Sequence, residues 1–137
     1  MSLKVTNRQL ELLRQEAWKA HPTEACGLLF GELSKESATV KRVVVTPNAL
    51  GSDVSFEIDP KVFYDSFTKA KQDDLEFLGF FHSHPASADP SSIDIKFMKL
   101  WGDAVWLILS SDEDKFAAFR MKNERVQVVH LRVEGKP

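Results

Sequence analysis

Two histidines and an aspartate lie close together in the second half of the chain, with the residue types and spacing of metal ligands. His82 and His84 flank one serine in the run GFFHSHP, and Asp94 ends the run PSSID that follows. Residues two apart on a β-strand point to the same side, so both imidazoles can reach one ion. Two nitrogens and one carboxylate leave a tetrahedral position open for water, which is typical of catalytic zinc, although other divalent ions also accept such ligands. The spacing therefore predicts a hydrolytic metal centre.

A hydrolase of this kind also needs a base that takes a proton from the attacking water. Glu24 is the best candidate, because it lies between a helix stopped at His21-Pro22 and the apolar run ACGLLF, at the end of an element. The alternative is an ordinary solvated turn carboxylate, and nothing in the sequence brings Glu24 near the histidines.

The run GFFHSHPASADPSSID, with HPTEACGLLFG upstream, resembles the JAMM/MPN+ metalloproteases. This family includes deubiquitinases of the proteasome lid, the signalosome and endosomal sorting, together with archaeal and bacterial relatives. This chain resembles the compact archaeal and bacterial members most. The resemblance implies that His82, His84 and Asp94 bind Zn²⁺, that Glu24 is the general acid/base, and that Ser91 donates to the oxyanion. It also implies a single α/β MPN domain over residues 1–137, with a mixed curved sheet flanked by helices, like that of cytidine deaminases.

The serine assignment has an alternative in the sequence. The loop between His84 and the serine is one residue shorter than the family's usual spacing, so counting forward from His84 selects Ser92. That register would place Ile95, which cannot bind zinc, in the ligand position, whereas counting back from Asp94 selects Ser91. Ser-x-x-Asp is also a capping signature, so Ser91 could serve only to cap a helix.

The elements that must position these residues follow from hydrophobic periodicity and turn signals. Thr6 and Gln9 form a capping-box pair, and Asp59-Pro60 is a good helix start. We expect helices over 6–20, 60–73 and 91–100, and strands over 25–30, 40–45, 56–58, 76–84, 104–110, 115–121 and 125–133.

Composition and charge exclude several classes of protein. The chain has 137 residues with 43% hydrophobic and 28% charged residues, which suits one globular domain. Its net charge of -2 offers no clustered positive surplus for nucleic acid or for a membrane surface. The single cysteine rules out an intrachain disulfide, and we find neither a signal-peptide core nor an apolar run long enough to span a bilayer. We expect a cytoplasmic protein.

Other distinctive side chains have ordinary structural explanations. Cys26 lies in an apolar run and is expected to be a buried small hydrophobe. Ser83 should point away from the metal, to the opposite face of its strand. Trp18, Trp101 and Trp106 are expected in the core or in the wall of a groove.

The leading functional hypothesis is a metallopeptidase that cleaves isopeptide or peptide bonds after the C-terminal tail of ubiquitin or a ubiquitin-like protein. The tail could add a strand beside residues 54–58 or the region after Pro85. A second hypothesis keeps the chemistry but takes sulfur-carrier proteins or short peptides as substrates. A third is a catalytically silent MPN module that binds other proteins, and the proteasome or another assembly is a candidate partner.

Overall fold

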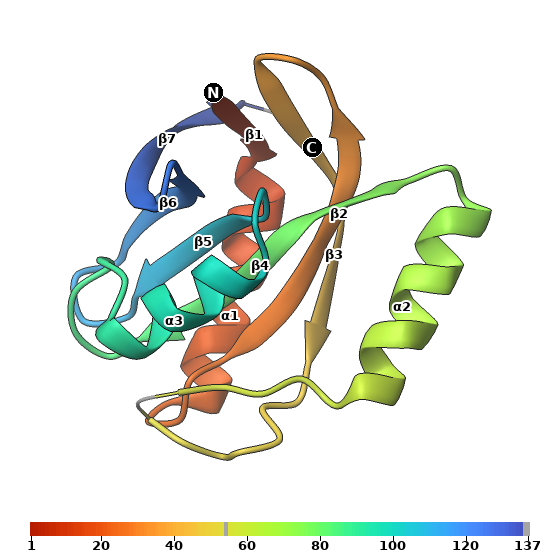
Figure 1. Ribbon diagram of the computed structural model, residues 1–137. Helices are drawn as coiled ribbons and strands as arrows, with labels where there is room; N and C mark the ends of the chain where they lie inside the picture. The colour runs from red at the N-terminus through yellow and green to blue at the C-terminus, as the bar shows by residue number, and fades with distance from the viewer. Residues whose placement is uncertain (54, 136–137) are drawn as a thin grey trace.

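The computed structural model describes residues 1–53 and 55–135 (Figure 1). Strand β1 and helix α1 open the chain and are followed by two strands, helix α2, strand β4, helix α3 and three further strands. In order, the elements are β1 (Ser2–Thr6), α1 (Asn7–Ala20), β2 (Cys26–Leu33), β3 (Ser37–Thr46), α2 (Pro60–Gln72), β4 (Glu76–His84), α3 (Ser92–Leu100), β5 (Val105–Ser110), β6 (Lys115–Lys122) and β7 (Arg125–Glu134).

The strands form one mixed sheet that curves until it closes. Their order is β1-β3-β2-β4-β5-β6-β7, and β1 closes the barrel by pairing with both β3 and β7 in parallel. The β4–β5 pair is also parallel, whereas the remaining pairs are antiparallel. The predicted α/β domain with a mixed, curved sheet and flanking helices is therefore confirmed.

The closing strand β1 has no counterpart among the elements expected from the sequence. Its pattern has only two buried residues, Leu3 and Val5, immediately before a helix cap. So short an alternation is a weak signal. The strand is defined mainly by the partners on either side of it, which sequence periodicity does not reveal.

The helices begin at the caps that the sequence predicts. Thr6 and Gln9 form a reciprocal capping box at α1, and Asp59 caps α2 with Pro60 in its first turn. Helix α1 buries Leu10, Leu13 and Ala17 in one of two hydrophobic clusters. Among the described residues, no helix is long and apolar enough to cross a membrane.

Strand β4 separates the two hydrophobic clusters because its side chains alternate between the faces of the sheet. Phe81 packs with α1 in one cluster, whereas Phe80 belongs to the other, which includes residues of α2 and α3. By the same alternation, His82 and His84 lie on the side of Phe80 and Ser83 lies opposite, as predicted. His82 and His84 thus project from the centre of the sheet toward α3.

Gly79 lets β5 approach β4 closely just before the two histidines. It pairs with Val105, and a Cβ atom at Gly79 would lie only 1.8 Å from the Val105 carbonyl oxygen. No other residue type fits at that position without moving β5. The register that follows from this contact pairs His82 with Ile108 and His84 with Ser110.

One sequence-based expectation needs correction. Residues 56–58 form no strand, because no ladder pairs them with a neighbouring strand before α2 begins. Trp106 is in the core, as expected for a tryptophan of the core or of a groove wall. Trp101, at 43% exposure, and Trp18, at 77% exposure, each line a groove, which also agrees with that expectation. Cys26 is buried, also as expected.

Candidate metal centre

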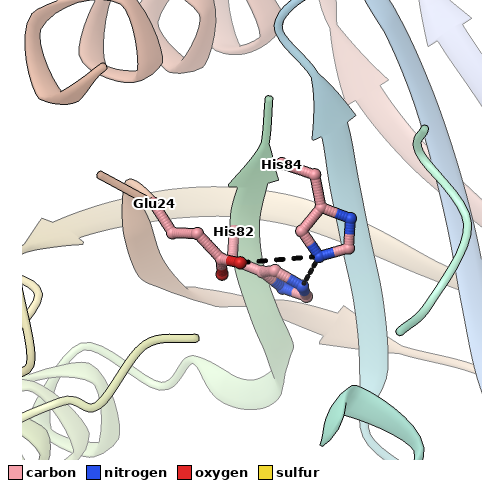
Figure 2. Close-up of side chains that lie close together, drawn as sticks. All are labelled: Glu24, His82 and His84. Carbon is pink, nitrogen blue, oxygen red and sulfur yellow. Dashed lines mark hydrogen bonds and ion pairs between the residues drawn. The ribbon is translucent and has the colours of Figure 1, made fainter. Parts of the chain in front are cut away.

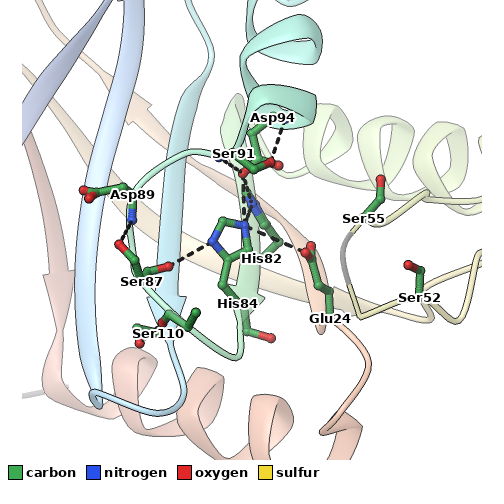
Figure 3. A network of polar contacts seen from close by, with 12 residues as sticks. Glu24, Ser52, Ser55, His82, His84, Ser87, Asp89, Ser91, Asp94 and Ser110 are labelled. Atoms are coloured by element: carbon green, nitrogen blue, oxygen red, sulfur yellow. Dashed lines mark hydrogen bonds and ion pairs between the residues drawn. The ribbon is translucent and has the colours of Figure 1, made fainter.

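Three side-chain atoms converge at the end of β4 and the start of α3 (Figure 3). His82 Nε2 and His84 Nε2 lie 3.1 Å apart, and Asp94 Oδ2 lies 3.1 Å from the first and 3.0 Å from the second. The ligand atoms of a tetrahedral zinc site, with bonds of about 2.0–2.1 Å, are separated by about 3.3–3.4 Å. The triangle is therefore close to the size that a small divalent cation requires.

The tautomer of His84 is set by a backbone contact. Its Nδ1 atom lies 3.0 Å from the carbonyl oxygen of Ser87, which can only accept a hydrogen bond. Nδ1 therefore carries the proton, and a neutral His84 presents the lone pair of Nε2 to the cluster. Such an outer hydrogen bond is the usual way in which proteins orient a metal-binding histidine.

The register of β2 against β4 explains how Glu24 reaches the histidines. Cys26 pairs with His82 in an antiparallel ladder, so continuing the ladder by two residues sets Glu24 opposite His84. The intervening Ala25 exchanges hydrogen bonds with Ser83, donating to its Oγ at 2.9 Å and accepting from its N–H at 3.0 Å. Ser83 thus ties the strand carrying the histidines to the segment carrying Glu24.

Glu24 lies beside the two histidines (Figure 2). Its Oε2 is 3.8 Å from His84 Nε2, and the ligand atoms of Glu24, His82 and His84 fall within 4.8 Å of one another. Glu24 could therefore also reach an ion. Asp94 is the better third ligand, because its Oδ2 is within 3.1 Å of both histidines.

Burial controls the protonation of Glu24. Its side chain is nearly inaccessible to solvent, and its Oε1 has no hydrogen-bond partner among the described residues. Burial raises the pKa of Glu24 to about 8, while nearby His84 partly opposes this shift. A carboxyl group with a pKa near neutrality can both accept and release a proton. A cation on the adjacent triangle would favour the carboxylate form.

The pKa shifts of Asp94 and His82 suit metal ligands, whereas the pKa of His84 moves toward the protonated form in the metal-free protein. Burial alone would raise the pKa of Asp94, but hydrogen bonds from His82 and His84 outweigh it and hold that pKa well below its usual range. Burial lowers the pKa of His82, which favours the neutral imidazole that binds metals. Burial also acts to lower the pKa of His84, but the contact with Asp94 reverses the shift and raises it.

Ser91 lies at the mouth of the site and caps α3. Its Oγ accepts from the Asp94 N–H at 3.1 Å, and its own N–H donates to Asp94 Oδ2 at 2.9 Å, the oxygen that faces the histidines. Ser91 also lines a cleft with Glu24, Asp53 and His84, whereas Ser92 is exposed and does not. This geometry favours Ser91 over Ser92.

An aromatic wall lies beside the cluster, and the sequence predicted its tryptophans but not the position of Phe56. Phe56 stacks on His82 with ring centroids 4.8 Å apart, and Trp106 meets the same ring edge-on at 6.1 Å. Both residues line an apolar groove between α2 and α3, with Leu50, Glu57, Ile58, Phe63, Phe80, Phe97 and Trp101. For Phe56, the sequence signal was the apolar content of 56–58, which resembled a short strand.

A closed mixed sheet that carries His-x-His at the end of β4 and an S-x-x-D cap on α3 defines the class of JAB/MPN domains. Residues 6–123 match the family model described as prokaryotic homologs of the JAB domain. The chain belongs to this family.

Proteins of known name and structure agree with this assignment. A desampylase of Pyrococcus furiosus is 37% identical over 112 residues, covering 81% of this chain and 76% of that protein. A human AMSH-like protease is 29% identical over 73% of this chain, but the match spans only 23% of its length. The solution structure of a Desulfitobacterium hafniense protein superposes with a TM-score of 0.87 at 28% identity, covering 98% of this chain and 94% of that one. A JAB1/MPN domain protein from Archaeoglobus fulgidus shares the fold, with a TM-score of 0.59 at 23% identity and coverage of 97% and 98%.

Proposed function

We propose that this protein is a zinc-dependent isopeptidase or peptidase that cleaves after the C-terminal tail of a ubiquitin-like protein. The observation that carries the proposal is the convergence of His82, His84 and Asp94 on one point, with Glu24 beside it. The names of the desampylase and the AMSH-like protease support a hydrolase of this class.

Each residue of the site has a separate role in the proposed reaction. A zinc ion held by His82, His84 and Asp94 would acidify a water molecule and polarise the scissile carbonyl. Glu24 takes the proton of the attacking water and later delivers it to the leaving amine. Ser91 uses its Oγ as acceptor toward Asp94, so its hydroxyl hydrogen is free to donate to the oxyanion of the tetrahedral intermediate.

The surroundings of the site suit an extended tail followed by a folded domain. The cleft at Glu24 and Ser91 is open to solvent, and the apolar groove reaches the cluster through Phe56 and Trp106. The edge strand that we expected at 54–58 finds no support, since Val54 lies outside the described residues and 55–58 form no strand. The region after Pro85, which borders the cleft, is the better candidate for contact with the tail.

Two alternatives give different experimental results. A hydrolase of sulfur-carrier proteins or short peptides would bind zinc and cleave those substrates in preference to ubiquitin-like fusions. A silent interaction module, recruited for example by a proteasome-like partner, would have no turnover. The complete set of His82, His84, Asp94 and Glu24 argues against the silent module. Such a module has no need of a buried carboxyl group like that of Glu24, whose Oε1 has no hydrogen-bond partner among the described residues.

The test combines metal analysis with turnover of a ubiquitin-like fusion. We expect about one zinc per chain and cleavage at the end of the tail, with both lost in Asp94→Ala, because that change removes one of three ligands. Asp103→Ala is the control, since Asp103 is exposed in the turn after α3. If Asp94→Ala holds as much zinc as the parent protein, the ligand assignment is wrong.

A further inference from the structure

Asn48, in the segment that joins β3 to α2, has an unusually complete set of hydrogen bonds. Its Nδ2 donates to three backbone carbonyl oxygens, those of Glu24 at 3.1 Å, Ser52 at 3.3 Å and Ser55 at 3.0 Å. Its Oδ1 accepts from two backbone N–H groups, those of Leu50 at 3.1 Å and Glu57 at 3.1 Å.

These contacts define the orientation of the Asn48 amide. An asparagine has two N–H donors on its nitrogen and two lone pairs on its oxygen. The three carbonyls share the two donors, so one N–H is bifurcated, and both ends of the amide are fully used. The reverse orientation would set the oxygen against three carbonyl oxygens. An aspartate at the same position has no donor for those carbonyls and would add a negative charge beside them.

The same segment holds both polar backbone atoms of Glu24. The Glu24 N–H donates to the Ser52 carbonyl at 2.8 Å, and the Glu24 carbonyl accepts from Asn48. On its other side, the chain is tied to β4 through Ala25 and Ser83. The backbone of Glu24 is therefore held between the strand of the histidines and the segment organised by Asn48.

Asn48 also organises the neighbourhood of Phe56. The residues that flank Phe56, Ser55 and Glu57, both bond to the Asn48 side chain through their backbones. Phe56 itself stacks on His82. One side chain thus connects the segment that carries the proposed base with the ring that packs on a proposed ligand.

We propose that Asn48 is a positioning residue that directs the Glu24 carboxyl group toward the metal centre. The proposal rests on the proposed role of Glu24 in hydrolysis. Asn48 makes no contact with the proposed ligands, so its loss should misplace Glu24 while leaving the metal bound. A misplacement of about 1 Å in a catalytic group can lower a rate by about 100-fold.

The first measurement compares Asn48→Asp with the parent protein on the cleaved fusion. We expect kcat to fall by about 10- to 100-fold, with KM and zinc content close to parent values. Asn7→Asp is the matched control, because it makes the same chemical change at an exposed site at the start of α1. Within residues 1–53 and 55–135, the Asn7 amide bonds only to the Gly135 carbonyl. Parent-like kcat in a folded Asn48→Asp protein contradicts the proposal.

The second measurement separates positioning from a general structural effect. If Asn48 acts through Glu24, Asn48→Asp should change the residual rate of Glu24→Gln by no more than about two- to threefold, because the group to be positioned is already gone. If Asn48→Asp lowers the rate of Glu24→Gln by as large a factor as it lowers the rate of the parent, Asn48 acts independently of Glu24.

The third measurement does not depend on turnover. It compares crystal structures of the metal-free parent and of metal-free Asn48→Asp. The Glu24 carboxyl group should lie 3.8 Å from His84 Nε2 in the parent and should be displaced from that position in the variant. If the Glu24 carboxyl group does not move, the positioning role of Asn48 is overturned even if activity falls. If the parent protein shows no turnover, only the proposed hydrolase function is overturned. If Asn48→Asp does not fold, Asn48→Ser, which keeps one donor, replaces it in all three measurements and its results decide.

Discussion

Glu24 combines burial with a pKa near neutrality, and these two properties are linked. A solvated glutamate would be ionised throughout the physiological range, whereas burial raises the pKa of Glu24 to about 8. General acid/base groups work best when their pKa lies near the working pH, because they must gain and lose the same proton in one turnover. In the proposed mechanism, the position of Glu24 opposite His84 keeps its proton beside the metal centre, with Oε2 3.8 Å from His84 Nε2.

Replacing Glu24 by glutamine tests this role. Glu24→Gln is nearly isosteric but cannot accept a proton, so we expect turnover to fall by about 10²–10⁴-fold. Zinc content should stay at the parent level, because Asp94 and the two histidines form the triangle without Glu24. Elemental analysis and steady-state kinetics on the same preparation check both points. Turnover near that of the parent would remove Glu24 from the mechanism, and lost zinc would make it a ligand instead.

At the scale of elements, the start of α3 combines a helix cap with the proposed metal ligand Asp94. The Ser91 N–H donates to the Asp94 oxygen that faces the histidines, and the Asp94 N–H donates to Ser91 Oγ. A capping box normally satisfies only the free N–H groups of a helix end. Here it also holds the carboxylate in the orientation that a cation needs, so helix stability and ligand geometry depend on the same pair.

Ser91→Ala separates the two functions of this cap. The backbone N–H of residue 91 remains, so Asp94 should keep its orientation and zinc content should not change. Losing the hydroxyl should lower kcat by about 10²–10³-fold if it donates to the oxyanion, with KM close to the parent value. The lost cap should also cost about 0.5–2 kcal/mol in the free energy of unfolding.

Ser92→Ala is the control for the shorter loop before α3. Ser92 is exposed and outside the cleft, so we expect kinetics like those of the parent. If Ser92→Ala lowered kcat while Ser91→Ala did not, the oxyanion donor would be Ser92. Asp94 would remain a candidate ligand in either case.

Over the whole molecule, the sequence predicted what depends on local patterns. Caps and periodicity located the three helices, and the His-x-His motif needed only the alternation of one strand. The approach of Glu24 to His84 could not be predicted from the residues alone, because it depends on the long-range register of β2 against β4. The contacts of Asn48 and Phe56 were not predicted, because irregular segments have no hydrophobic period and these contacts form only when the chain folds.

The stability of the metal-free protein should also depend on pH through Glu24. The pKa of Glu24 is about 8 in the folded protein and near the ordinary glutamate value of 4.5 in the unfolded chain, so between these values the folded state binds more protons. Stability contributed by the protonated group is therefore fully present below about pH 4.5 and is lost as the pH rises toward 8. One proton gives a slope of at most about 1.4 kcal/mol per pH unit.

Chemical denaturation of parent and Glu24→Gln, both in the presence of a chelator from pH 5 to 8, measures this dependence. Both proteins keep His84 and Asp94, so the difference in unfolding free energy mainly reports the proton on Glu24. Glutamine does not ionise, and we expect Glu24→Gln to become progressively more stable than the parent as the pH rises through this range. A difference that stays constant from pH 5 to 8 would mean that Glu24 has an ordinary pKa in the folded protein. The buried carboxyl group would then be ionised without a bound cation, and its suitability as a proton carrier would have to come from the metal rather than from burial.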